Sequence, residues 1–270
     1  MKKGALMKFK FLKIMTFSLA LSLFFSSSVF AKDMAFSWST PRNGHRQPVF
    51  PREAAAVSEY GAYYIDKSHG DNTEEKVLYL TFDAGYENGN IARIIDTMKE
   101  KNVKGAFFVL DHLIIQNKDL LKRMKDEGHL ICNHTKSHKD LTKCTDAEIK
   151  NDLEALESVC QENMGFSLDK YFRFPEGKYS LHALKTVSLL GYKTIFWSFG
   201  YEDWDNKHQP SADYAFNKII SNTHNGAVIL LHPTSKTNAD ILPRLIDKWR
   251  EMGYRFGTLD ELVNSNQSVS

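Results

Sequence analysis

Short apolar runs alternate with periodic apolar segments from residue 77 to near the end of the chain. The runs predict strands, and apolar residues that recur every three or four positions predict helices. Strands are expected at 77–82, 106–110, 129–133, 171–174, 193–199, 227–231 and 254–258, with helices at 91–98, 113–124, 145–159, 180–190, 211–221 and 240–252. This alternation predicts an α/β fold in which helices cover a parallel sheet, either closed into a barrel or doubly wound.

Polar residues stand at or just after the carboxyl ends of predicted strands. They are Asp83, His134, Arg173, Asp203 and His232. In a barrel these strand ends share one face, where active sites are built, so the five side chains would converge. We therefore expect a distorted or incomplete (β/α) barrel of about seven parallel strands with its site on that face. Taken alone, Asp83 could equally cap the helix that follows it.

Two flanking segments lack the alternating pattern. Residues 1–31 combine basic residues, an apolar core at 14–25 and small residues up to Ala31, which is typical of a secretory signal peptide. We expect a secreted or cell-envelope protein, with an uncleaved anchor as the alternative. Residues 32–76 contain Pro41, Pro48 and Pro51 and no periodic pattern. They are expected to form an extension packed on the domain at 77–270.

Composition narrows the possible partners. The chain has 35 basic and 33 acidic residues, and residues 1–31 carry five lysines and no acid. The remainder has 30 basic and 33 acidic residues, so no basic patch for nucleic acid is expected there. Cys132, Cys144 and Cys160 are odd in number and lack metal-type spacing, so buried thiols are expected. A bridge between Cys144 and Cys160 is an open alternative that we do not predict.

His134 and His138 stand four residues apart. This spacing lets two imidazoles reach one cation if the turn is helical. We expect a divalent metal, zinc first, with cobalt or manganese as alternatives. If the motif is taken alone, unliganded surface histidines are the simpler explanation. Two imidazoles hold zinc weakly, so a third protein ligand or several waters must complete the shell.

Two pairs of charged groups are expected among the other strand-end residues. Arg173 lies in an otherwise apolar strand and needs an acidic partner, and pairing with Asp83 would keep the pKa of that carboxyl low. A hydrogen bond from His232 to Asp203 would raise the imidazole pKa and let it donate a proton. A structural salt bridge and a buried structural histidine are the respective alternatives.

Motifs of the forms Thr-Phe-Asp-x-Gly, His-Thr-x-x-His, Arg-x-Pro-x-Gly, Asp-Trp and Leu-x-His follow one another between residues 77 and 262. The ordered set resembles the five motifs of the polysaccharide deacetylases, the NodB-homology fold of carbohydrate esterase family 4. Gly-Tyr-Glu-Asn-Gly at 85–89 and Trp-Ser at 197–198 are similar to the branch that deacetylates muramic acid in the spore cortex, the δ-lactam-forming de-N-acetylases.

The resemblance implies a role for each matching position. Asp83 matches the general base and Arg173 the residue that tunes it, while His232 matches the general acid and Asp203 the residue that tunes it. His134 and His138 match the metal ligands. The backbone N–H of Glu176 matches the oxyanion donor, and Trp204 and Leu230 match the walls of the acetyl-methyl pocket.

One position departs from the family pattern. The first motif usually reads Asp-Asp, with the second residue as third metal ligand, and here that residue is Ala84. A methyl group cannot coordinate a cation, so we expect a weak site that relies on Asp83 and water instead.

The resemblance implies a metal-dependent hydrolase that removes N-acetyl groups from N-acetylmuramic acid of peptidoglycan, the step before muramic δ-lactam formation in spore cortex. A deacetylase of N-acetylglucosamine in peptidoglycan or a related polymer is one alternative, and a glycan-binding module inactivated at Ala84 is another. The expected partner is the peptidoglycan glycan strand, with no nucleic acid and no protein partner, and the chain is expected to be a monomer.

Overall fold

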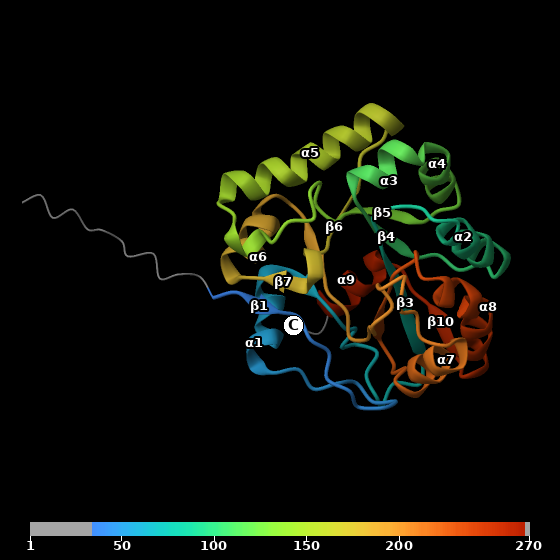
Figure 1. Cartoon of the computed structure of the whole chain (residues 1–270). Helices are drawn as coiled ribbons and strands as arrows, with labels where there is room; N and C mark the ends of the chain where they lie inside the picture. Colours follow the sequence, from blue (N-terminus) through green and yellow to red (C-terminus); the bar gives the residue numbers. More distant parts are fainter. Residues whose placement is uncertain (1–33, 268–270) are drawn as a thin grey trace, which may run out of the picture. The chain divides into compact units, whose positions relative to one another are not determined.

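The computed structural model describes residues 34–267 (Figure 1). The expected signal peptide at 1–31 lies outside the described residues. Among residues 34–267, no helix has both the length and the apolar character needed to cross a membrane.

A curled parallel sheet forms the centre of the described chain. Beyond the regular strands, Phe199 forms a parallel bridge with Ile229, so the segment around Phe199 lies beside the strand at Ala227–Leu231 and the sheet curls back on itself. The expected distorted, incomplete barrel is therefore confirmed. The sheet follows the path β10 (Tyr254–Phe256), β3 (Lys76–Ala84), β4 (Ala106–Val109), β5 (Leu130–Asn133), β6 (Asp169–Phe172), β8 (Lys193–Ile195) and β2 (Ala62–Tyr63), and β9 (Ala227–Leu231) pairs with β3 beside this path.

Helices surround this sheet, as Figure 1 shows. Most of them pack their apolar faces on the outside of the curled sheet. Helix α9 differs, because its Leu259, Leu262 and Val263 contact Val77 and Tyr79, which face the inside of the sheet. The helices are α1 (Arg52–Ala55), α2 (Asn90–Glu100), α3 (Asp111–Gln116), α4 (Lys118–Asp126), α5 (Asp146–Met164), α6 (Leu181–Leu189), α7 (Ala212–Ser221), α8 (Lys236–Glu251) and α9 (Leu259–Gln267), with 3-10 turns η1 (Ala56–Tyr60), η2 (Leu141–Lys143) and η3 (Pro175–Gly177).

Residues of β3 alternate between two apolar clusters, as the period of a strand requires. Leu80, Phe82 and Ala84 belong to the cluster shared with the helices α2, α3 and α8. Val77 and Tyr79 belong to the cluster inside the curled sheet. Alternation therefore assigns Asp83 to the inner face and Ala84 to the outer one.

Several predicted boundaries are wrong. The expected helix at 113–124 is two helices, because Asn117 takes a non-helical conformation with φ −132° and ψ 48°. The strands expected to reach 174 and 199 end at Phe172 and Ile195, and the helix expected from 240 begins at Lys236. The predicted start of the helix at 145 is confirmed, since Thr145 and Glu148 form both hydrogen bonds of a capping box there.

The segment before β3 packs on the sheet. Its strand β1 (Phe36–Ser37) pairs antiparallel with β7 (Lys178–Tyr179), and β2 lies beside β8. Trp38 stacks on Phe196 at 4.3 Å between ring centroids. A division of the chain at residue 76 stays a prediction.

The three cysteines are free thiols. Cys132 and Cys160 are buried, as expected, but Cys144 is only partly buried because it lies in the open turn after η2. Burial raises the pKa of the Cys160 thiol to about 11, so this sulfur is a protonated, inert core group at neutral pH.

Candidate active site

The register of the parallel strands places the strand-end residues at one edge. Phe82 of β3 pairs with Leu231 of β9, so Asp83 and His232 occupy the next position on both strands. Farther along the sheet, Asn133 of β5 pairs with Phe172 of β6, and their successors are His134 and Arg173. Asp83 interacts electrostatically with all three of these successors.

Arg173 has no exposed surface and is held by two strands, β3 and β8. Its Nη1 donates to Oδ1 of Asp83 at 2.8 Å, its Nη2 to Oγ1 of Thr81 at 2.8 Å, and its Nε to the carbonyl oxygen of Ile195 at 2.9 Å. Burial opposes ionisation of Asp83, but the charge and hydrogen bond of Arg173, together with His134 and His232, hold the pKa of this carboxyl below its ordinary value. The ion pair expected between Arg173 and Asp83 is present, and Asp83 is an ionised proton acceptor.

Asp203 is fully buried and holds His232 by two bonds. Its Oδ1 lies 2.7 Å from Nδ1 of His232, and its Oδ2 accepts the backbone N–H of His232 at 2.8 Å. Because the carboxylate accepts, Nδ1 carries a proton and Nε2 is left for the site. Burial lowers the pKa of His232, but the Asp203 carboxylate, with a smaller contribution from Asp83, raises it, and the net shift of this pKa is upward.

His134 and His138 face each other, with ring centroids 5.0 Å apart. Nδ1 of His134 donates to the carbonyl oxygen of Arg173 at 2.8 Å, so its Nε2 presents a lone pair. Burial lowers the pKa of His134 to about 4, which keeps the ring neutral, as a metal ligand must be. The segment is an irregular loop and not a helical turn, with φ 69° at Thr135 and 51° at His138.

The donor set fits a cation held by two imidazoles. Nε2 of His134 lies 3.7 Å from Oδ2 of Asp83, so a carboxylate oxygen stands beside this ring. Within residues 34–267, no three His, Cys, Asp or Glu side chains form a group suited to a metal ion. Ala84 is fully buried in the outer apolar cluster, so its side chain lies on the other face of β3 from Asp83.

The other predicted residues lie near this edge on three segments. Glu176 takes a left-handed conformation, φ 55°, in the turn after Arg173, and its exposed side chain pairs with Lys178 at 2.6 Å. The ring of Trp204, 58% exposed, lies 6.2 Å from that of His232. Leu230 is buried on β9 two positions before His232 and therefore on the same side of the strand.

Gly177 explains why the turn after Arg173 needs its glycine. A Cβ atom there would lie 2.8 Å from Trp197 and 2.9 Å from Cβ of Trp38, and its φ is 64°. Only glycine combines this conformation with this approach.

Sequence reasoning missed two residues that hold the catalytic groups. Thr81 accepts from Arg173, and its place two positions before Asp83 on one strand face was the available signal. Asn238 at the start of α8 donates to Oδ2 of Asp203 at 2.6 Å and to the carbonyl oxygen of His232 at 3.1 Å. Nothing in the sequence distinguishes Asn238 from the polar residues around it.

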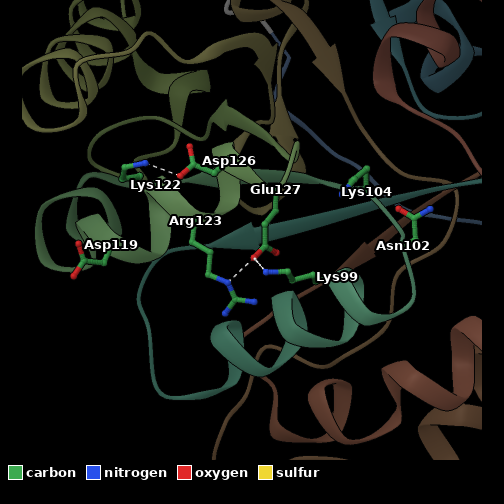
Figure 2. Close-up of a pocket in the computed structure, with 8 residues that line it drawn as sticks. All are labelled: Lys99, Asn102, Lys104, Asp119, Lys122, Arg123, Asp126 and Glu127. Carbon is green, nitrogen blue, oxygen red and sulfur yellow. Dashed lines mark hydrogen bonds and ion pairs between the residues drawn. The ribbon is translucent and has the colours of Figure 1, made fainter.

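A hollow of about 650 Å³ lies between α2 and α4, away from these groups (Figure 2). Five of its charged side chains pair with one another: Glu127 pairs with Arg123 and Lys99, and Lys122 pairs with Asp126. None of the predicted site residues lines it. The candidate active site is therefore the strand-end edge and not this hollow.

Comparisons with known proteins agree with the motifs. A family model described as polysaccharide deacetylase matches residues 70–195. The chain is 37% identical to the peptidoglycan-N-acetylmuramic acid deacetylase PdaA of Bacillus subtilis, over 84% of this chain and 85% of that protein. It is 33% identical to the peptidoglycan-N-acetylglucosamine deacetylase PgdA of Listeria monocytogenes, over 72% of this chain and 40% of that protein.

The fold agrees as well. The solved structure of Bacillus subtilis PdaA, a family 4 carbohydrate esterase, superposes with a TM-score of 0.79 at 36% identity, covering 86% of this chain and 98% of that chain. With the motifs in order and the fold shared over this length, the chain belongs to the polysaccharide deacetylases, carbohydrate esterase family 4.

Proposed function

We propose that this enzyme removes the acetyl group from N-acetylmuramic acid in peptidoglycan glycan strands. The proposal is supported by the higher identity and nearly full mutual coverage with the muramic acid deacetylase, compared with the partial coverage of the N-acetylglucosamine deacetylase. Deacetylation of N-acetylglucosamine in peptidoglycan or a related polymer is the second candidate.

One observation carries the proposal: Asp83 and His232 are neighbours on paired strands and have opposite pKa shifts. A carboxylate with a lowered pKa accepts a proton at neutral pH, and an imidazole with a raised pKa donates one. Two titratable groups whose surroundings drive their pKa values apart are the signature of a general base and a general acid. An inactive glycan-binding module would have no use for this pair.

The reaction then assigns a task to each side chain. Asp83, held by Arg173, takes the proton of a water that attacks the acetamide carbon. The backbone N–H of Glu176 donates to the oxygen that becomes negative. His232, whose Nδ1–H is bound by Asp203, gives the proton on Nε2 to the departing sugar nitrogen. The products are acetate and the free amino sugar.

The proposed cofactor is a divalent cation held by His134 and His138, zinc first. When bound, it would supply a Lewis acid for the acetamide carbonyl. The side chains of Trp204 and Leu230 carry no group that takes up or gives a proton near neutral pH, and we propose that both form apolar walls for the acetyl methyl group.

Location and context belong to the same proposal. A cleaved signal peptide at 1–31 would place the domain at 77–270 outside the cytoplasm, where its glycan lies, and the muramic acid preference points to spore cortex. An extension at 32–76 packed on the domain and a monomeric chain without protein partners complete the proposal.

Purified, peptide-trimmed glycan strands test the proposed substrate. They would be incubated with metal-loaded enzyme, digested, and analysed by mass spectrometry for the sugar that has lost its acetyl group. We expect deacetylated muramic acid or its lactam. Deacetylated glucosamine alone would establish the second candidate, and no acetate release would refute both.

A further inference from the structure

The loop that carries the two imidazoles takes its hydrogen bonds from side chains. The N–H of Thr135 donates to Oδ1 of Asn133 at 2.8 Å, and the N–H of His138 donates to Oγ1 of Thr135 at 2.8 Å. The two N–H groups between them, of Lys136 and Ser137, both donate to Oδ1 of one carboxylate. Each N–H group between the histidines is therefore satisfied without strand or helix pairing.

That carboxylate is Asp152, in the second turn of α5. It is 7% exposed, and its Oδ1 accepts from Lys136 at 2.7 Å and from Ser137 at 3.3 Å. Its Oδ2 accepts from Oγ of Ser137 at 2.5 Å and pairs with Nζ of Lys139 at 3.1 Å. One side chain of α5 thus holds two consecutive loop positions, Lys136 and Ser137, and pairs with Lys139.

The loop needs such an anchor because its backbone is unfavourable. Thr135 and His138 both have positive φ, and Thr135 is β-branched, so each conformation is uphill for the isolated segment. Without the Asp152 carboxylate, the N–H groups of Lys136 and Ser137 would also lose their acceptor. Without Asp152, the spacing between the two rings would no longer be fixed in advance of metal binding.

We propose that Asp152 is a positioning residue of the metal site, which sets the distance and mutual orientation of His134 and His138. The inference rests on the proposed function, in which these two imidazoles hold the cation. Since Ala84 supplies no third ligand, affinity depends on how well two rings are arranged beforehand, and the anchor from α5 provides that arrangement.

The test measures metal affinity rather than turnover. Apparent Kd values for Zn²⁺ would be determined by competition with a chromogenic chelator for the wild type, Asp152→Asn and Asp152→Ala. We expect about tenfold weaker binding for Asp152→Asn and up to about a hundredfold for Asp152→Ala, the range seen when groups that orient metal ligands are removed. The visible spectrum of the Co²⁺ form, which reports ligand geometry, should change as well.

Glu154 provides the matched control, because it is an exposed acid two residues further along α5. Glu154→Gln removes the same charge from the same helix and should leave the Kd within about twofold. Ser137→Ala removes only the hydroxyl contact, keeps both backbone contacts, and should weaken binding by less than Asp152→Asn. If circular dichroism shows that Asp152→Ala does not fold, the zinc affinity of Ser137→Ala tests the role of the Asp152 contact.

The outcomes separate this inference from the proposed function. If His134→Ala and His138→Ala abolish zinc binding while folded Asp152→Asn and Ser137→Ala proteins bind as the wild type does, the role of Asp152 is refuted and the metal site stands. If removing either imidazole leaves zinc binding unchanged, the metal site itself is refuted. Weakened binding in Asp152→Asn with a normal Glu154→Gln protein supports the inference.

Discussion

The two parts of the site are held in place by different means. Asp83 and His232 follow paired positions of β3 and β9, so the main-chain register of the sheet places them. His134 and His138 lie on a loop whose N–H groups are bound by side chains, including Asp152 of α5. The proton-handling groups therefore depend on strand pairing, whereas the metal-binding groups depend on a few side-chain contacts that a single substitution can remove.

His232→Ala should have the largest effect, because it removes the proton donor while the sheet stays intact. We expect kcat/KM for acetate release to fall about 10²- to 10⁴-fold, the usual contribution of a general acid. Zinc content should not change, since His232 is bound by Asp203 and not by the loop. His45→Ala, an exposed histidine outside the site, is the control, and full activity of His232→Ala would overturn the assignment.

Arg173→Met should destabilise the fold strongly. It leaves the largely buried Asp83 carboxylate without its partner, and breaking a buried pair costs about 3–5 kcal/mol in unfolding free energy. Urea unfolding of the metal-free protein measures this loss. Arg93→Met removes a half-exposed ion pair with Asp240 and should lose no more than about 1 kcal/mol. An equal loss of unfolding free energy in the two variants would contradict the view that the buried pair of Arg173 and Asp83 matters more than an exposed one.

Ala84→Asp tests on which face of β3 this position lies. Because Ala84 is buried among apolar side chains on the outer face, a carboxylate there should destabilise the protein by about 3 kcal/mol without strengthening zinc binding. Urea unfolding and the chelator assay give both values. Tighter zinc binding at unchanged stability would show that the side chain points into the site.

Asp203→Asn should shift the pH dependence of activity. The reaction needs protonated His232, whose raised pKa keeps it protonated until the pH passes that value. Removal of the carboxylate charge lowers this pKa, so the alkaline limb of the kcat/KM profile should move to lower pH. An unmoved limb with a lower plateau would mean that Asp203 only orients the ring.

Tyr86→Ala should have the smallest effect and act on substrate binding alone. Tyr86 follows Asp83 by three positions, is 45% exposed, and its hydroxyl accepts from Nδ2 of Asn206 at 2.6 Å. An aromatic ring presented in this way can cover the apolar face of a sugar, so KM should rise about three- to tenfold at unchanged kcat. Tyr214→Ala, an equally exposed tyrosine on α7, is the control, and an equal rise there would remove Tyr86 from the binding surface.

The part of the site that strand pairing positions, Asp83, Arg173 and His232, could be predicted from the sequence. Apolar runs ending in a charged residue identify β3, β6 and β9, and an arginine inside an apolar strand requires an acid such as Asp83. These arguments need only the periodicity of a strand and the cost of burying a charge. The predicted contacts of Arg173 and His232 are accordingly present.

The arrangement of the loop that carries His134 and His138 could not be predicted in the same way. The spacing of His134 and His138 is compatible with a helical turn. In the structure, however, the backbone N–H groups of Thr135 and Lys136 donate to the side chains of Asn133 and Asp152, and the segment is a loop. Such contacts join one side chain to a distant backbone and leave no period in the sequence. The contacts of Asn238 were missed for the same reason.

Acetate release by Asp83→Asn is the most direct test of the account. The substitution keeps the shape of the side chain and removes its capacity to accept a proton beside His232. With wild-type and variant enzymes loaded to equal zinc content, the account predicts deacetylated muramic acid from the wild type and a loss of at least about a hundredfold in the variant. Comparable rates from the two proteins would contradict the pairing of Asp83 and His232 as base and acid.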